Sequence, residues 1–479
     1  MTAGIRFVMF NYAVTINSNC HNLYLMNNFL KNKHLISRAG FGIHHNDIEK
    51  YKNRSPKDFY KEISNTGDYH ILQTDIAGLS PEEYQELAKA VDKKPVNLFN
   101  KNYNNAVKKS WHEEMIKSPS QLQEKMALFW HGHFATRIQQ ALFNKEIIEI
   151  FRKNALGNFR DLVFAVSKSA AMLNFLNNQQ NKKANPNENF ARELMELFTL
   201  GRGQYTEKDI RESARAFTGW SYNGLGEFTD NKKQHDTGEK EFLGKTDNFD
   251  GADIINIILE KPACAEFITG KIYQFYVNED PDEKLIKSLS QKFYQSNYDI
   301  MALMDEIFLS DWFYSEKNIG AKVKSPVELI VGIRRILPMD LQNRDIVYNF
   351  EKLLGQELLQ PPNVAGWPSG AAWIDASTLL LRMKIPAVIA GYKTLDIEPK
   401  ANDDVNMGKS DQNIVVNKKQ NTITIHWESM AKILDQDLFN LLLANPDKSL
   451  EKLIAQFNTE KSKKHLMISI MSTPDYQLC

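Results

Sequence analysis

Apolar residues recur every three to four positions along most of the chain, and this spacing predicts amphipathic α-helices. Several predicted helices begin with a capping residue followed by proline, as at Ser118-Pro119 and Ser325-Pro326. Strict alternation is limited to Ile414–Val416 and Thr422–Ile425, which predict a small β-hairpin over residues 413–426. The pattern therefore predicts an all-α fold, a large multi-helix domain with one small β-hairpin near the C-terminus.

The most clearly marked helix is predicted over residues 186–200. Asn185 is expected to be its N-cap, Pro186 takes the first helical position, and Glu188 falls where the carboxylate of a capping box belongs. Apolar residues form one arc of this helix, namely Phe190, Ala191, Leu194, Met195, Leu197 and Phe198. Polar residues form the opposite arc, namely Glu188, Asn189, Arg192, Glu193, Glu196 and Thr199. Because Glu193 and Glu196 are three residues apart, both carboxylates are expected on one face.

A second helix, predicted to start at Ser118, carries two histidines near its end. Leu122, Met126, Phe129 and His133 recur at helical spacing, which places His133 on the inward, apolar face. His131 lies about 200° around the helix from His133 and is expected to point elsewhere. Both histidines can serve one site only if the helix ends or distorts near Gly132.

Two further stretches lack a helical period. Residues 221–250 contain several glycines together with His235 and Asp236, and a connection of this length is usually functional or disordered. The prolines and glycines of Gln360–Gly370 predict a rigid loop that carries Trp367. The Trp367 ring is expected either to fill the helical core or to stack on a sugar.

The pattern divides the chain into four segments. Residues 1–27 are an N-terminal extension, either a weak signal-like segment or the result of a start assigned upstream of the true Met26. Residues 28–395 form the main helical domain, residues 396–412 a polar linker, and residues 413–479 the hairpin and final helices, packed on the main domain. Without a clear signal peptide, the localisation stays open between cytoplasmic and exported.

Composition excludes several classes of function. The chain has 59 basic and 59 acidic side chains, which gives no electrostatic reason to expect nucleic acid as a partner. No apolar stretch approaches the roughly 18 residues that a membrane span requires. The three cysteines are far apart in the sequence and predict neither a disulfide framework nor a cysteine metal site.

Several long motifs resemble one bacterial family, called domain of unknown function 1800. They are Phe129–Phe134, Asn187–Gly201, Tyr205–Glu207, Ala214–Trp220, His235-Asp236 and Pro361–Trp367, and their order and spacing match from about Leu35 to the C-terminus. The resemblance implies little chemistry, because the family is named for its unknown function. It implies a partner, because members are often encoded beside sulfatase-like proteins, and it keeps export open, because many members appear exported.

The same motifs hold the residues that could carry chemistry. There is no P-loop, no Gly-x-Ser-x-Gly elbow and no His-Glu-x-x-His sequence, so nucleotide and serine-hydrolase chemistry are unsupported. What remains is a mixed set of imidazoles and carboxylates, which suits a divalent zinc, iron or manganese ion. The candidate metal residues are His131, His133, Glu193, Glu196, His235 and Asp236. We expect His133, Glu193, Glu196 and His235 to meet at one polar pocket, with the loop at 221–250 folded over it.

Two functions stay open at this point. In the first, the protein is a metal-assisted enzyme, hydrolytic or oxidative, in which Glu188 acts as general base and Arg192 holds an anionic substrate group. In the second, it is a non-catalytic helical scaffold or the partner subunit of a sulfatase-like protein. The same charged residues then serve as ion pairs that fix helix packing. Convergence of His133, Glu193 and His235 in one pocket would favour the enzyme.

Overall fold

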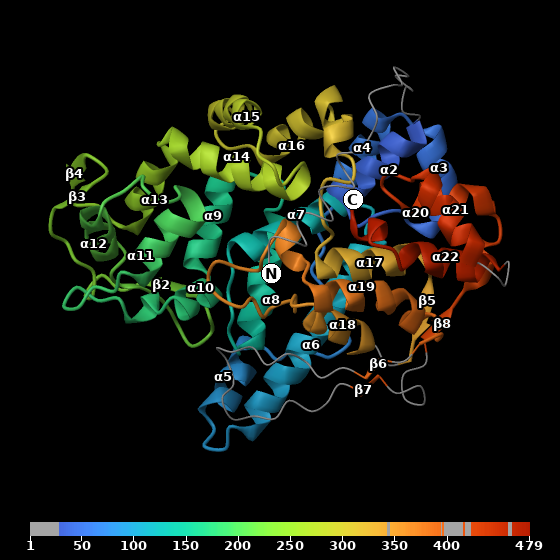
Figure 1. Ribbon diagram of the computed structural model, residues 1–479. Helices are drawn as coiled ribbons and strands as arrows, with labels where there is room; N and C mark the ends of the chain where they lie inside the picture. The colour runs from blue at the N-terminus through green and yellow to red at the C-terminus, as the bar shows by residue number, and fades with distance from the viewer. Residues whose placement is uncertain (1–27, 343–344, 394, 397–414, 417–422, 458–461) are drawn as a thin grey trace.

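The computed structural model describes residues 28–342, 345–393, 395–396, 415–416, 423–457 and 462–479 (Figure 1). These residues are mostly helical, which confirms the predicted fold class. The α-helices are α2 Asn28–Ala39, α3 Ile48–Asn53, α4 Pro56–Ser64, α5 Pro81–Lys89, α6 Lys94–Lys117, α7 Gln121–His133, α8 Ala141–Lys153, α9 Phe159–Lys168, α10 Ala170–Phe175, α11 Asn189–Glu193, α12 Glu207–Ala216, α13 Gly251–Leu259, α14 Pro262–Tyr276, α15 Glu283–Gln295, α16 Ile300–Phe308, α17 Pro326–Ile336, α18 Asp345–Leu353, α19 Ala376–Ile389, α20 Leu438–Leu442, α21 Lys448–Phe457 and α22 Lys463–Met471.

Short helices of other types join or extend these elements. A π-helix, η3 Leu194–Thr199, continues directly from α11. The 3₁₀ helices are η1 His45–Asp47, η2 Asn178–Gln180, η4 Asp311–Tyr314, η5 Glu316–Asn318, η6 Gly370–Trp373, η7 Trp427–Met430, η8 Asp435–Asp437 and η9 Asp475–Gln477. None of the described helices is both long enough and apolar enough to cross a bilayer.

The strands form two-stranded antiparallel pairs. They are β1 Trp220–Tyr222 with β2 Phe228–Asp230, β3 Lys240–Phe242 with β4 Lys245–Asp247, β5 Met339–Leu341 with β8 Ile423–Ile425, and β6 Leu395–Asp396 with β7 Val415–Val416. The two predicted strands near the C-terminus therefore exist, but their predicted pairing with each other is wrong. Alternation along one strand identifies its inward face and not its partner, and both strands pair with segments distant in sequence.

Helix α7 lies at the centre of the molecule (Figure 1) and contacts α2, α4, α6 and α8. Every residue from Gln121 to His131 is buried, so this helix has no solvent-facing side. The predicted cap at Ser118 is two residues early, because the Ser118 hydroxyl accepts from the Ser120 N–H and closes a turn before the helix. By contrast, the helix start predicted at Ser325-Pro326 is confirmed. Ser325 and Glu328 form a capping box with reciprocal hydrogen bonds.

The first and last parts of the described chain lie side by side. Figure 1 shows α2 and α20–α22 together at one end of the molecule, with α11, α12 and the β3–β4 pair at the opposite end. The Lys33 ammonium donates to the carbonyl oxygens of Asn440 and Leu443 at 2.6 and 2.5 Å. Val323 and Leu478 form an isolated antiparallel bridge. The predicted extension at 1–27 and nearly all of the predicted linker at 396–412 lie outside the described residues.

Leu194→Ala tests the packing of the segment that holds most of the predicted site. Leu194 is 1 % exposed, so truncating it removes buried apolar contacts and should lower the free energy of unfolding by about 2–5 kcal/mol. Leu197 is only partly buried, and Leu197→Ala should cost clearly less. Denaturant titration of both variants measures the difference. Equal losses would show that the two side chains are packed alike.

Candidate functional site

The predicted helix over residues 186–200 begins three residues later than expected. α11 starts at Asn189, so the predicted N-cap at Asn185 is wrong. Asn185 instead forms a bridge with Lys182, and the Asn187 N–H donates to the Asn181 amide oxygen. Because these bonds use the backbone in a turn, the helix cannot begin before it. Glu188 precedes the helix and makes no capping bond.

The second half of the motif is a π-helix rather than an α-helix. The N–H groups of Leu200 and Gly201 both donate to the Met195 carbonyl, at 2.9 and 3.0 Å. The wider turn adds residues to the repeat, so Thr199 is buried although the α-helical period placed it on the polar arc. Gly201 then ends the segment with a φ of 77°, as the sequence predicts. π-Helical turns are frequent at functional sites.

The His133 ring faces inward, as predicted, and packs against Phe129 and Trp130, but His131 faces inward as well. His131 is fully buried, and its Nε2 accepts from the Leu359 N–H at 3.0 Å. His133 is partly exposed, and its Nε2 donates to the Phe198 carbonyl at 3.0 Å. His131 departs from its predicted direction because helical period identifies the inward side only when a helix has an outward side, and α7 has none over Gln121–His131. Burial lowers the pKa of both rings to about 3, so both are neutral.

Close backbone contact with α7 explains why the motif Pro361–Trp367 contains Gly366. Gly366 has a φ of 83°, and a β-carbon there would lie 2.1 Å from the Gly132 carbonyl oxygen. This approach brings the Trp367 ring edge-on to His131, with 5.0 Å between ring centroids. Trp367 therefore packs on the helical core, which was one of the two roles predicted for it. The loop at 360–370 and the end of α7 form one packing unit.

The charged residues of the predicted site are engaged in ion pairs. Arg192 donates to both carboxylate oxygens of Glu207 at 3.0 and 2.9 Å and to Glu188 at 3.2 Å. Glu196 accepts from Arg202 at 2.7 Å and from the Tyr205 hydroxyl at 3.1 Å. These contacts join α11 and the π-helix to α12 and to the turn that precedes it.

His235 and Asp236, which were predicted to act together, contact different residues. The Asp236 carboxylate accepts from Arg215 at 2.8 and 3.2 Å, and this guanidinium lowers the pKa of Asp236. His235 is buried, with its Nδ1 2.9 Å from the Thr218 carbonyl oxygen. Asp236 therefore does not orient His235.

The stretch at 221–250 is ordered by α12 rather than folded over a pocket. Its β3–β4 pair packs against α12, and the Leu243 N–H donates to Asp209 on that helix at 2.8 Å. The buried Lys240 ammonium donates to the carbonyl oxygens of Asp236 and Gly238 and to the Asn248 side chain. These bonds close the loop on itself.

Glu193 differs from the other predicted residues. No hydrogen bond or ion pair of its carboxylate is found in the part of the chain that the structure describes. Its pKa is raised by desolvation and by the neighbouring Glu196. Among the described residues, no three His, Cys, Asp or Glu side chains lie close enough together to hold one metal ion. The convergence predicted for His133, Glu193, Glu196 and His235 is therefore not found among the described residues. Glu196 pairs with Arg202, and the two imidazoles bond to backbone carbonyl oxygens.

An open groove that the sequence did not predict lies beside the π-helix. Its volume is about 410 Å³, and it runs between the turn after Leu200, helix α14 and the start of α15. Its charged and amide side chains are Arg202, Gln204, Glu266, Lys271, Gln274 and Glu283. The Lys271 ammonium is exposed at the groove surface, and partial desolvation by the groove walls lowers its pKa. None of these residues except Arg202 has a hydrogen bond or ion pair within the described chain.

Comparison of the sequence with models of known protein families shows which family the chain belongs to. A family model described as "Protein of unknown function (DUF1800)" matches residues 34–478. The chain belongs to the DUF1800 family. No curated protein and no solved structure matches it. The resemblance inferred from the motifs is therefore confirmed, and the packing of Gly132 against Gly366 gives two DUF1800 motifs a structural role.

A matched pair of glycine variants tests this packing role. Gly355 has a φ of 91° and no atom within 4 Å of an added β-carbon, so Gly355→Ala isolates the backbone strain, about 1–2 kcal/mol. Gly366→Ala adds the overlap with the Gly132 carbonyl and should lower the unfolding midpoint much further. Thermal unfolding measures both. Equal midpoints would mean that the loop moves away from α7 at no cost.

Glu193 and Glu196 should respond to pH with opposite signs. The raised pKa of Glu193 means that its ionisation destabilises the fold, so Glu193→Gln should raise the unfolding midpoint at pH 7. The lowered pKa of Glu196 means that Glu196→Gln should cost stability at pH 7, up to about 1 kcal/mol. Both differences should fade as the pH falls and the wild-type carboxyls become protonated, at a higher pH for Glu193 than for Glu196. A loss of stability in Glu193→Gln would reveal a partner for this carboxylate.

Proposed function

We propose that the protein is a non-catalytic helical subunit that recognises a partner through the groove beside α14. The partner proposed is a sulfatase-like protein, as the genomic association of DUF1800 proteins implies. The observation that carries the proposal is the contrast between two neighbouring sets of polar residues. Most of those of the motifs form ion pairs. Of the groove side chains in the described chain, only Arg202 forms an ion pair, and the Lys271 ammonium lies over the Phe267 ring.

The paired residues support a structural role for the motifs. Arg192 joins α11 to α12, Glu196 joins the π-helix to Arg202, and Asp236 joins the loop to Arg215. Ion pairs of this kind fix the relative positions of helices and need no substrate. They place Gly201 and Arg202 at the edge of the groove.

The groove supports recognition of a polar partner. Lys271, Glu266 and Glu283 offer charges of both signs, and Gln204 and Gln274 offer amides that donate and accept. Phe267 adds apolar surface at the groove floor. Charges of both signs favour orientation of a protein surface rather than capture of a simple ion.

The recognition role is tested by co-expressing the full chain with a sulfatase-like protein encoded beside it. A stoichiometric complex is expected in analytical ultracentrifugation. Lys271→Glu reverses a groove charge and should weaken the complex by about tenfold or more. Lys284→Glu makes the same change on α15 outside the groove lining and should leave the complex intact. No complex, or equal weakening by both variants, would contradict the role.

A second candidate is the metal-assisted enzyme. It is favoured by Glu193, an uncommitted carboxyl with a raised pKa directly before a π-helical turn. His133, Glu193, Glu196 and His235 would be the ligands, with Glu188 as base and Arg192 as anion holder. Glu196 would have to release Arg202 to take part.

Elemental analysis of protein purified without a metal-binding tag tests this second candidate. An enzyme of this type should carry zinc, iron or manganese in stoichiometric amount, and Glu193→Gln should lose it. Metal content that is unchanged in Glu193→Gln would exclude Glu193 as a ligand.

A further inference from the structure

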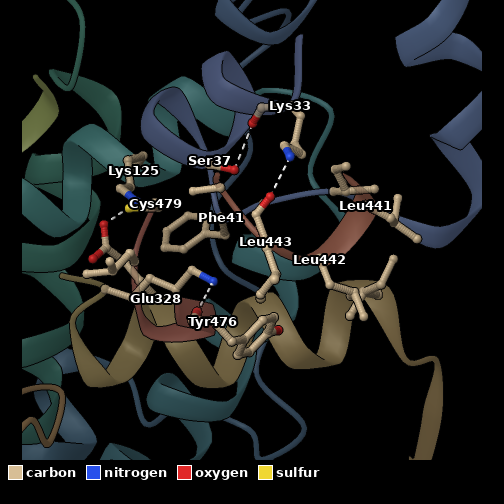
Figure 2. Close-up of a pocket in the computed structure, with 17 residues that line it drawn as sticks. Lys33, Ser37, Phe41, Lys125, Glu328, Leu441, Leu442, Leu443, Tyr476 and Cys479 are labelled. Carbon is tan, nitrogen blue, oxygen red and sulfur yellow. Dashed lines mark hydrogen bonds and ion pairs between the residues drawn. The ribbon is translucent and has the colours of Figure 1, made fainter. Parts of the chain in front are cut away.

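A small cavity lies at the other end of the molecule from the motifs, where α2, α7 and α17 meet the last residues of the chain. Its volume is about 60 Å³, which is room for about four water molecules. Figure 2 shows Lys33 and Lys125 on its wall, with Glu328, Tyr476 and Cys479. Lys324 completes the set of lysines that line it. The cavity is therefore small, and amines lie among largely apolar walls.

Two of these lysines have no carboxylate partner among the described residues. The Lys33 ammonium donates only to the carbonyl oxygens of Asn440 and Leu443. The Lys324 ammonium donates to the Tyr476 carbonyl at 2.6 Å and lies 3.9 Å from the centre of the Tyr476 ring. Carbonyl groups satisfy the N–H donors but leave the buried positive charge uncompensated.

The carboxylate of Glu328 is already shared. Both Lys125 and Lys322 form ion pairs with its Oε1 atom. The negative charge at Cys479 attracts both ammonium groups and raises the pKa of Lys125 and of Lys324. Burial acts in the opposite direction and lowers both pKa values. Burial is the larger effect, and it lowers the pKa of Lys33 to about 7 and those of Lys125 and Lys324 to about 8.

Two buried arginines add to the positive charge around the cavity. Arg382 is fully buried, and its Nη1 donates to the Lys324 carbonyl at 2.9 Å. Its Nε and Nη2 atoms have no partner among the described residues. Arg38 donates to the carbonyls of Val277 and Asn318. Cations therefore outnumber anions in this buried region, and such an excess is normally compensated by a bound anion or by loss of protons.

We propose that this cavity is a binding site for a small tetrahedral oxyanion of the phosphate or sulfate class, held by Lys33 and Lys324. The volume suits an ion of about five non-hydrogen atoms, and the two ammonium groups supply charge-assisted donors. Lys33 belongs to α2, and Lys324 comes just before α17 and bonds to the Tyr476 carbonyl. A bound anion would thus link the first described helix to the last residues of the chain. This site is independent of the groove and of the proposed partner.

Thermal unfolding of the full chain tests the site with inorganic phosphate and with sulfate, each against chloride at equal ionic strength. At millimolar concentrations the midpoint should rise and saturate with either oxyanion, as specific binding to the folded state requires. The double variant Lys33→Met with Lys324→Met should lose this rise. The control variant Lys317→Met removes an exposed lysine that pairs with Asp282. It should show the same rise of the midpoint as the wild type, together with any general salt effect.

Calorimetry of the wild-type protein supplies a readout that does not depend on variant folding. An anion between the two amines raises their pKa, so binding at pH 8 should take up protons. Titration in two buffers of different ionisation enthalpy measures this uptake. Saturable heat with proton uptake supports the site. A midpoint rise shared with chloride or kept in the double variant, or binding without proton uptake, would overturn it.

Discussion

The structure depends on one constraint, which is the complete burial of a polar helix. α7 contains glutamine, glutamate, lysine and histidine side chains, and no face of Gln121–His131 reaches solvent. Each buried polar group left without a partner would cost about 1–3 kcal/mol, so partners on neighbouring elements stabilise the fold. Glu124 accepts from Trp111 on α6 and from Arg152 on α8, and Lys125 pairs with Glu328 on α17. These bonds fix the helices around α7 in one arrangement.

Features that depend on neighbouring residues could be predicted from the sequence. The fold class, the box at Ser325 and the helix end at Gly201 are set within one or two turns of chain. Features set by distant residues could not. Asn185 does not cap a helix, because its backbone forms a bridge with Lys182. Each of the two C-terminal strands pairs with a segment that its own alternation does not identify.

The candidate site shows the same division between features set by neighbouring residues and features set by distant ones. The sequence identified a charged face on residues 188–196, and that face exists, but arginines from separate positions neutralise most of it. Helical period placed His133 inward correctly but could not predict the burial of His131, since it assumes a solvent-facing side that α7 lacks over Gln121–His131. The groove escaped prediction because Lys271, Gln274 and Glu266 lie on α14, outside any motif. Only the position of Arg202 just after Gly201 hinted at it.

The contact between Lys33 and Leu443 also limits when folding can finish. These residues are 410 positions apart in the sequence, and Lys33 is buried against the segment that carries Leu443. At typical synthesis rates, roughly 20–80 s pass between their emergence from the ribosome. During that time α2 lacks the segment against which Lys33 is buried. The amino-terminal part of the domain must therefore wait in an incomplete state, open to chaperones, until nearly the whole chain has been made.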